Sequence, residues 1–139
     1  MATQLFIGYA TAAYILLRHG LDGLRKSHAT PAIGTTPSAR RAAELRSVLE
    51  LPEESRLDVC IIDENDKRNG KALRSHKCRY AAPGDYISLS AAEGVFIATP
   101  ALAFLQLAET LTVPALVLLG LELCGTYVSD DGRFTRSKP

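Results

Sequence analysis

The sequence predicts an α/β fold, in which a small mixed β-sheet of about four or five strands carries packed helices and ends in a helix pair. Short β-branched runs bounded by turn residues alternate with longer amphipathic segments. The chain has 139 residues, of which 47% are apolar and 22% are charged, a globular composition able to bury a core. We expect one domain over residues 1–128, followed by a polar tail over residues 129–139.

The first half of the chain is expected to alternate strand and helix. Its predicted elements are a strand, two helices and a second strand, at residues 4–7, 8–18, 38–51 and 57–62. Thr36 is the predicted N-cap of the second helix, with Pro37 at its first helical position. The strand at 57–62 is almost continuously apolar, which indicates burial on both faces.

The second half predicts three more strands and the helix pair. The strands are expected at residues 73–80, 86–89 and 95–98. Thr99 and Pro100 form a helix-start signature, and Thr112 is the N-cap candidate of the last helix, which Gly125 is expected to end.

The apolar patterns of the helix pair predict which side chains face inward. In the first helix the expected buried face is Phe104, Leu107, Ala108 and Leu111, with Gln106 and Glu109 outside it. In the last helix Leu116, Leu119, Gly120 and Leu123 share one face, and Val117, Leu118 and Leu121 cover much of the rest, so this helix is expected to be buried nearly all round.

The same stretch is too short to cross a membrane. A membrane-spanning helix needs about 20 predominantly apolar residues. Glu109 and Glu122 leave only residues 110–121 uncharged between them, and Pro114 interrupts that run. The sequence therefore predicts a core helix pair and no membrane partner.

Charge is distributed unevenly along the chain. Residues 1–79 hold 13 Lys and Arg against 9 Asp and Glu, whereas residues 80–139 hold 3 against 6. One basic run could neutralise phosphates, and two arginines on the outward face of the helix at 38–51 could add to it. These candidate nucleic-acid contacts are Arg40, Arg41, Lys67, Arg68, Lys71, Arg74, Lys77 and Arg79. The alternative for both groups is an ordinary solvated surface.

No complete catalytic or metal-binding motif is found in the sequence. His76 and Cys78 form an H-x-C pair near Cys60, but a zinc site requires four ligands at other spacings. The acidic run at 63–67 lacks the continuation that a metal-dependent nuclease needs. The three cysteines, Cys60, Cys78 and Cys124, make a poor disulfide framework and are typical of reduced thiols in a cytoplasmic protein. We expect no cofactor.

The C-terminal segment "FLQLAETLTVPALVLLGLELCGTY" resembles a family of actinobacterial proteins related to the AbiEi-type abortive-infection antitoxins. The matching residues are Thr99, Pro100, Leu102, Phe104, Leu105, Gln106, Leu107, Ala108 and the run from Glu122 to Tyr127. The opening "LFIGYATAAYILLRH" is similar to the first strand and helix of that family, with Tyr9 where histidine is common. Longer members of the family continue into a restriction-endonuclease-like domain, so this chain resembles their N-terminal part.

Together these observations predict a non-catalytic, DNA-associated regulatory or antitoxin-like domain of a bacterial defence or toxin–antitoxin system, located in the cytoplasm, with double-stranded DNA as partner. One alternative is a protein-interaction module that binds a toxin or a second copy of itself, which an exposed apolar patch on the last helix would favour. Another is a metal-dependent nuclease fragment, which would need Asp58, Asp63 and Asp66 to converge.

Overall fold

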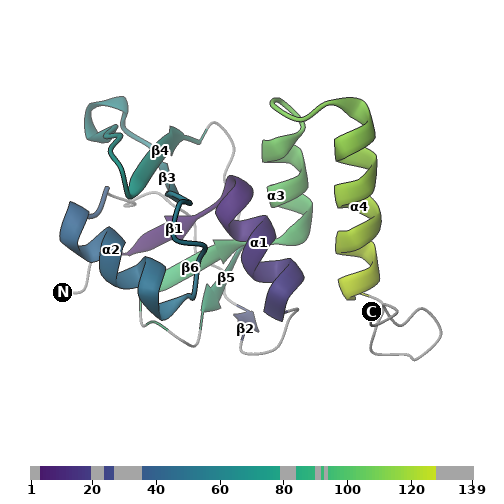
Figure 1. Ribbon diagram of the computed structural model, residues 1–139, viewed down its shortest axis with the longest axis horizontal. Coiled ribbons are helices and arrows are strands. Elements are labelled where there is room, and N and C mark those ends of the chain that lie inside the picture. Colours follow the sequence, from purple (N-terminus) through teal and green to yellow (C-terminus); the bar gives the residue numbers. More distant parts are fainter. Residues whose placement is uncertain are drawn as a thin grey trace.

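The computed structural model has a mixed sheet with helices packed on it, which confirms the predicted α/β class (Figure 1). The structure describes residues 4–19, 24–26, 36–78, 84–89, 92 and 94–127. The predicted tail at 129–139 and the basic residue Arg79 lie outside the described residues.

The sheet has six strands among the described residues, in the order β2-β5-β6-β1-β3-β4. Their bounds are β1 Leu5–Ile7, β2 Leu24–Lys26, β3 Leu57–Ile61, β4 Leu73–Lys77, β5 Tyr86–Leu89 and β6 Val95–Ala98. The pairs β1–β6 and β3–β4 are parallel, and the other three pairs are antiparallel. The sequence predicted about four or five strands and missed β2, so the sheet has one strand more than expected.

The centre of the sheet is buried on both sides. Every residue of β1, β3 and β6 is buried, as the continuous apolar run of β3 predicted. The ring of Phe6 lies 5.0 Å from that of Tyr86, edge to face, and 5.1 Å from that of Phe96, stacked. These rings join three neighbouring strands, because β1, β6 and β5 follow one another in the sheet.

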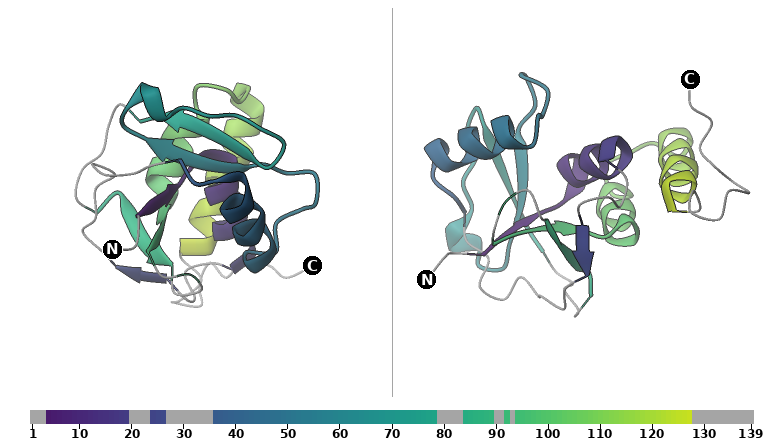
Figure 2. Two further views of the ribbon diagram at one scale, coloured as in Figure 1. Left: turned by 90° about the vertical axis from the view of Figure 1, so that its left-hand side faces the viewer. Right: turned by 90° about the horizontal axis from the view of Figure 1, so that it is seen from below.

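Four α-helices surround this sheet within the described part of the chain. They are α1 Tyr9–His19, α2 Ala39–Val48, α3 Pro100–Leu107 and α4 Val113–Tyr127. Helices α1, α3 and α4 contact one another, and α1 and α3 also contact the sheet. Helix α2 packs against β3, and Figure 2 shows it on the side of the β3–β4 pair away from α1. Helix α4 forms one end of the molecule, and β3, β4 and α2 form the other (Figures 1 and 2).

Two helix boundaries differ from the prediction. Helix α2 is capped by Ser38, whose Oγ accepts a hydrogen bond from the N–H of Arg41 at 3.1 Å, and not by Thr36. The side chain of Thr36 instead donates to the main-chain oxygen of Asp66 and ties the approach to α2 to the β3–β4 connection. Helix α4 continues through Gly125 to Tyr127. The cap at Thr99 with Pro100 in the first turn of α3 is confirmed.

The inward faces of the helix pair were predicted only in part. In α3, Leu107 is buried as expected, but Ala108 is exposed and Gln106 is buried, because this amide finds partners inside. In α4, the side bearing Leu116, Leu119, Gly120 and Leu123 does face the protein. Val117, Leu118 and Leu121 are exposed, however, because α4 packs on α1 and α3 from one side only. No helix in the described ranges is both long and apolar enough to cross a membrane.

Candidate functional site

The predicted basic residues lie around the connection between β3 and β4, at the edge of the sheet. This connection includes the short 3-10 helix η2 Glu64–Asp66 and leads into β4, the last strand of the sheet on this side. Four cations there are exposed, and none has an ion-pair partner among the described residues. We call this group the basic turn; it comprises Lys67, Arg68, Lys71 and Arg74.

Lys77 differs from the basic turn in two ways. Its Nζ lies 3.8 Å from Oε2 of Glu64, so a carboxylate already faces its charge. In addition, Arg74 and Lys77 are three residues apart on one strand, and successive side chains of a strand point to opposite faces. The two charges therefore do not share a strand face, and the four residues of the basic turn define the free positive surface.

Arg40 and Arg41 start α2 and share one acidic neighbour. Nε of Arg40 lies 3.8 Å from Oε1 of Glu44, and Nη1 of Arg41 lies 3.6 Å from Oε2 of the same residue. Exposed pairs of this kind contribute little to stability, but they reduce the positive potential at the arginines. The two arginines are therefore secondary to the basic turn, although the Thr36 hydrogen bond brings their segment beside it.

A second polar group links β3, β4 and the start of α1. Oδ1 of the buried Asp58 lies 2.9 Å from Nε2 of His76 on the paired strand. Oδ2 of Asp58 accepts the main-chain N–H of Thr11 at 3.2 Å, and the N–H of Asp58 donates to Oγ1 of Thr11 at 2.9 Å. The ring of Tyr9 stacks on that of His76 at 3.8 Å.

This Asp58–His76 pair has the arrangement of an oriented base but lacks a nucleophile. A general base must lie within hydrogen-bonding distance of the group it deprotonates. In the described part of the chain, the hydrogen bond of the His76 side chain goes to Asp58, and no hydroxyl or thiol is bonded to the ring. The pair therefore holds α1 against the β3–β4 edge and provides no complete nucleophilic site.

Gln106 of α3 connects the start of α1 to two buried thiols. Its Oε1 accepts the N–H of Tyr9 at 2.8 Å. Its Nε2 lies 3.5 Å from Sγ of Cys60 and 4.0 Å from Sγ of Cys78. A Cβ at Gly8 would lie 2.6 Å from both the Cys60 sulfur and Oε1 of Gln106, so only glycine fits here. Tyr9 itself has a φ of 55°, an unfavourable conformation that these contacts maintain.

The two thiols and their neighbours have shifted acidities. The hydrogen bond between the thiols raises the pKa of Cys60 and lowers that of Cys78. Burial raises the pKa of Tyr86, whose Oη lies 3.4 Å from Sγ of Cys78. Burial also raises the pKa of Tyr9 to about 12. Cys60, Tyr86 and Tyr9 are therefore protonated over a wide pH range, and Cys78 is tied to Cys60 and Tyr86, which is typical of an internal polar cluster.

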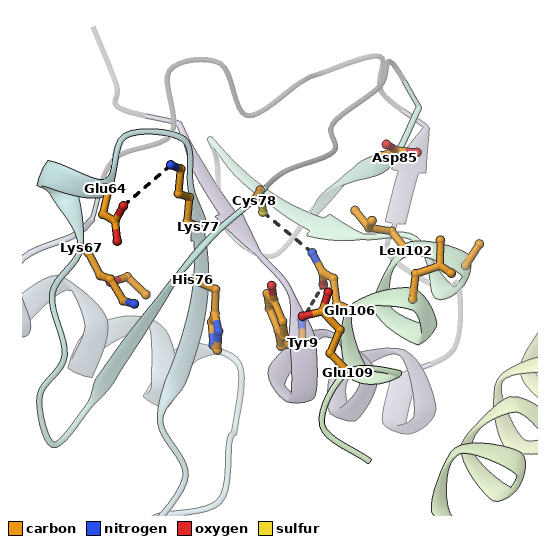
Figure 3. A pocket seen from close by; sticks show the side chains of 13 residues that line it. Tyr9, Glu64, Lys67, His76, Lys77, Cys78, Asp85, Leu102, Gln106 and Glu109 are labelled. Atoms are coloured by element: carbon orange, nitrogen blue, oxygen red, sulfur yellow. Dashed lines mark hydrogen bonds and ion pairs between the residues drawn. The ribbon is translucent and has the colours of Figure 1, made fainter. Parts of the chain in front are cut away.

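An open cleft of about 810 Å³ lies between the β3–β4 connection and α3, and its wall includes Tyr9, His76, Cys78 and Gln106 (Figure 3). Its lining carries both signs of charge: carboxylates from Glu64, Asp85 and Glu109, and ammonium groups from Lys67 and Lys77. This mixture does not favour an anion. The cleft adjoins the basic turn, since Lys67 belongs to both, but its lining is not a positive surface.

The carboxylates that the nuclease hypothesis requires, those of Asp58, Asp63 and Asp66, form no metal-binding group. Asp58 is engaged with Thr11 and His76, whereas Oδ1 of Asp63 accepts the N–H of Asn65 at 2.9 Å and caps η2. Within the ranges that the structure describes, no group of three or more His, Cys, Asp or Glu side chains could hold a metal ion. We call Tyr9, Cys60, Cys78 and Gln106 the Gln106 cluster; the sequence offered no signal for it, because its four members come from four separate segments.

The chain was also compared with known proteins. No family model, no curated protein and no solved structure matches it. The fold and the residues around the basic turn are thus the basis for a functional proposal, and the resemblance to the AbiEi-type family stays a prediction.

Proposed function

We propose that this chain is a non-catalytic, DNA-associated domain that holds double-stranded DNA by its phosphate backbone. The observation that carries the proposal is the basic turn. Lys67, Arg68, Lys71 and Arg74 are exposed at one edge of the sheet, and none has an ion-pair partner among the described residues. When such unpaired cations neutralise DNA phosphates, the DNA releases the counterions condensed on it, and this release favours binding.

The type of contact follows from the side chains present. Lys and Arg contacts to phosphates supply affinity and orientation, but they read no sequence. Single-stranded nucleic acid is usually held by stacking on exposed aromatic rings. In the segment from Lys67 to Cys78 there is no aromatic residue apart from His76, whose ring is already stacked on Tyr9. This composition favours duplex DNA as the partner.

The regulatory or antitoxin-like role in a bacterial defence system rests on the family resemblance alone. A role on bacterial DNA would place the chain in the cytoplasm, as the sequence predicts. A protein-interaction module is the second candidate, and the exposed apolar side of α4 favours it. Asp58 and the thiols of Cys60 and Cys78 need no part in either role, because they are buried.

The proposal is tested by comparing two variants that carry the same charge inversion at different positions. Lys71→Glu inverts a charge of the basic turn, and Arg18→Glu inverts a charge on α1, where Arg18 lies 3.5 Å from Glu50. Both variants have the same net charge. Binding to a labelled duplex is measured by fluorescence anisotropy at about 50 mM salt, and circular dichroism checks the fold.

We expect Lys71→Glu to weaken duplex binding by about 5- to 10-fold, and Arg18→Glu by less than about 2-fold. Equal losses in the two variants would mean that only the net charge matters and would contradict a localised surface. If the wild-type chain does not bind at low salt, the DNA proposal is wrong.

A further inference from the structure

The outer side of α4 is apolar and exposed. Val113, Val117, Leu118 and Leu121 have 74%, 54%, 64% and 66% of their surface accessible to solvent. Single exposed apolar residues are common on soluble proteins, but several large ones on one side of one helix are not. Glu122 is the only charged residue of the helix; it is exposed and lies one turn beyond Leu118, at the margin of this side.

The residues on this side follow the spacing of a helix–helix seam. Pro114, Val117, Leu121 and Cys124 are separated by three, four and three residues, and all four are exposed. This is the spacing by which the a and d positions of one helix meet those of another. Leu118 flanks the seam. We call Val113, Pro114, Val117, Leu118, Leu121 and Cys124 the outer face of α4.

The chemistry of the outer face restricts its partner. An uncharged apolar helix face pairs best with another uncharged apolar helix face, since a charged partner would lose water and gain no counter-charge. Within the described residues, the other exposed large apolar side chains, Val48, Ile62 and Leu105, belong to different elements and form no comparable row. The outer face of α4 is thus its own best complement, and a self-complementary surface assembles around a two-fold axis.

The position of α4 leaves room for such a partner. The inner side of the helix packs on α1 and α3, where Gly120 lies against the ring of Phe104. Figures 1 and 2 show α4 as the outermost helix at one end of the molecule, with β3, β4 and α2 at the opposite end. A second copy docked on α4 would therefore leave both basic turns free at the two far ends of the assembly.

We propose that the chain forms a homodimer in which the outer face of α4 packs against the same face of a second copy. Helices of 15 residues bury less than the roughly 1,600 Å² of a standard interface, so we expect a weak dimer whose population rises with protein concentration. This proposal does not depend on DNA binding and is tested without DNA.

The test is sedimentation equilibrium of the full 139-residue chain from about 1 to 500 µM, with three variants. Val117→Glu and Leu121→Glu each place a charge in the seam. Leu105→Glu is the matched control, because it makes the same change at a similarly exposed leucine of α3 that is not part of the outer face. We expect wild type and Leu105→Glu to dimerise alike, and each seam variant to raise Kd by at least about 100-fold. Thermal melting confirms that each variant folds.

A cysteine cross-link provides a second test, which remains informative if a Glu variant of the seam fails to fold. Leu118 flanks the seam midway along the outer face, so Leu118→Cys in a Cys124→Ser background brings two sulfurs together when the helices run antiparallel. Val117→Cys in the same background does so when they run parallel, because a seam position then faces its own copy. Air oxidation is expected to give a disulfide-linked dimer with one of these two variants and not with Leu105→Cys in the same background. A wild-type chain that stays monomeric at 500 µM, a larger oligomer, or a dimer insensitive to the seam changes would overturn the proposal.

Discussion

Oδ1 of Asp58 on β3 lies 2.9 Å from Nε2 of His76 on β4, and this contact joins the sheet edge to α1 through Thr11. Three donors surround the buried carboxylate: the His76 ring and the N–H and hydroxyl of Thr11. An acceptor removed from such a position leaves its donors unpaired, which costs more than the bonds themselves contribute. The pair therefore has a measurable role in stability.

Asp58→Ala is expected to lower the free energy of unfolding by about 2–4 kcal/mol, because the N–H of Thr11 and the His76 ring lose their acceptor. Urea unfolding followed by circular dichroism measures the change. Asp63→Ala serves as the control, since Asp63 is exposed and its side chain accepts a hydrogen bond from its near neighbour Asn65. A loss for Asp58→Ala no larger than the loss for the control would show that the carboxylate does not hold this edge.

Gly8→Ala is expected to destabilise the protein by about 2–3 kcal/mol, because the new Cβ would lie 2.6 Å from Sγ of Cys60 and from Oε1 of Gln106. Gly70→Ala makes the same change where a Cβ would meet nothing within 4 Å, and its effect should stay within about 0.5 kcal/mol. Thermal melts of both variants give the comparison. Similar melting temperatures for the two would contradict the close approach of α3 to the start of α1.

The three thiols should react at very different rates. Cys124 is exposed, whereas Cys60 and Cys78 are buried. At the lowest protein concentrations, where the proposed dimer dissociates, we expect a disulfide reagent such as DTNB to modify Cys124 of the native chain at least about 100-fold faster than the other two, and Cys124→Ser to abolish that fast phase. After unfolding in guanidinium, all three should react. Rapid modification of Cys60 or Cys78 in the folded chain would show that the Gln106 cluster is more open than the structure indicates.

Stability should fall at alkaline pH through Tyr9. Burial raises the pKa of this phenol from 10.0 to about 12, so the unfolded chain loses the proton first. Its contribution is fully present below pH 10 and is lost as pH rises through 12, and because the side chain is only half-buried the slope stays well below the limit of about 1.4 kcal/mol per pH unit. Urea unfolding of wild type and Tyr9→Phe between pH 8 and 12 tests this. The wild-type free energy should fall more steeply above pH 10, and parallel curves would contradict the burial of this hydroxyl.

Local signals in the sequence predicted several elements well. The strand at 95–98 has the predicted bounds, and Thr99 with Pro100 starts α3 as expected. These features depend on neighbouring residues: β-branched or apolar side chains for the strand, and a hydroxyl that accepts from Leu102 for the cap. Local signals could not predict the parallel register of β3 and β4, which places Asp58 near His76.

Features set by distant contacts could not be predicted. Strand β2 has three residues, two of them basic, and its extended state depends on pairing with β5. Gln106 looks like an outward polar residue on a helix, but its partner Tyr9 is 97 positions away. The pattern of α4 showed apolar residues on every side but not which side is covered, since that depends on where α1 and α3 lie.

The central claim is that the basic turn contacts DNA phosphates, and the salt dependence of duplex binding tests it most directly. Anisotropy titrations from about 25 to 300 mM salt give the slope of log K against log salt, which changes by about 0.9 for each phosphate contact. If Lys67, Arg68, Lys71 and Arg74 each meet a phosphate, changing all four to Ala should make the slope shallower by about 3–4. An unchanged slope in a folded variant, or no binding by the wild-type chain at 25 mM salt, would contradict the claim.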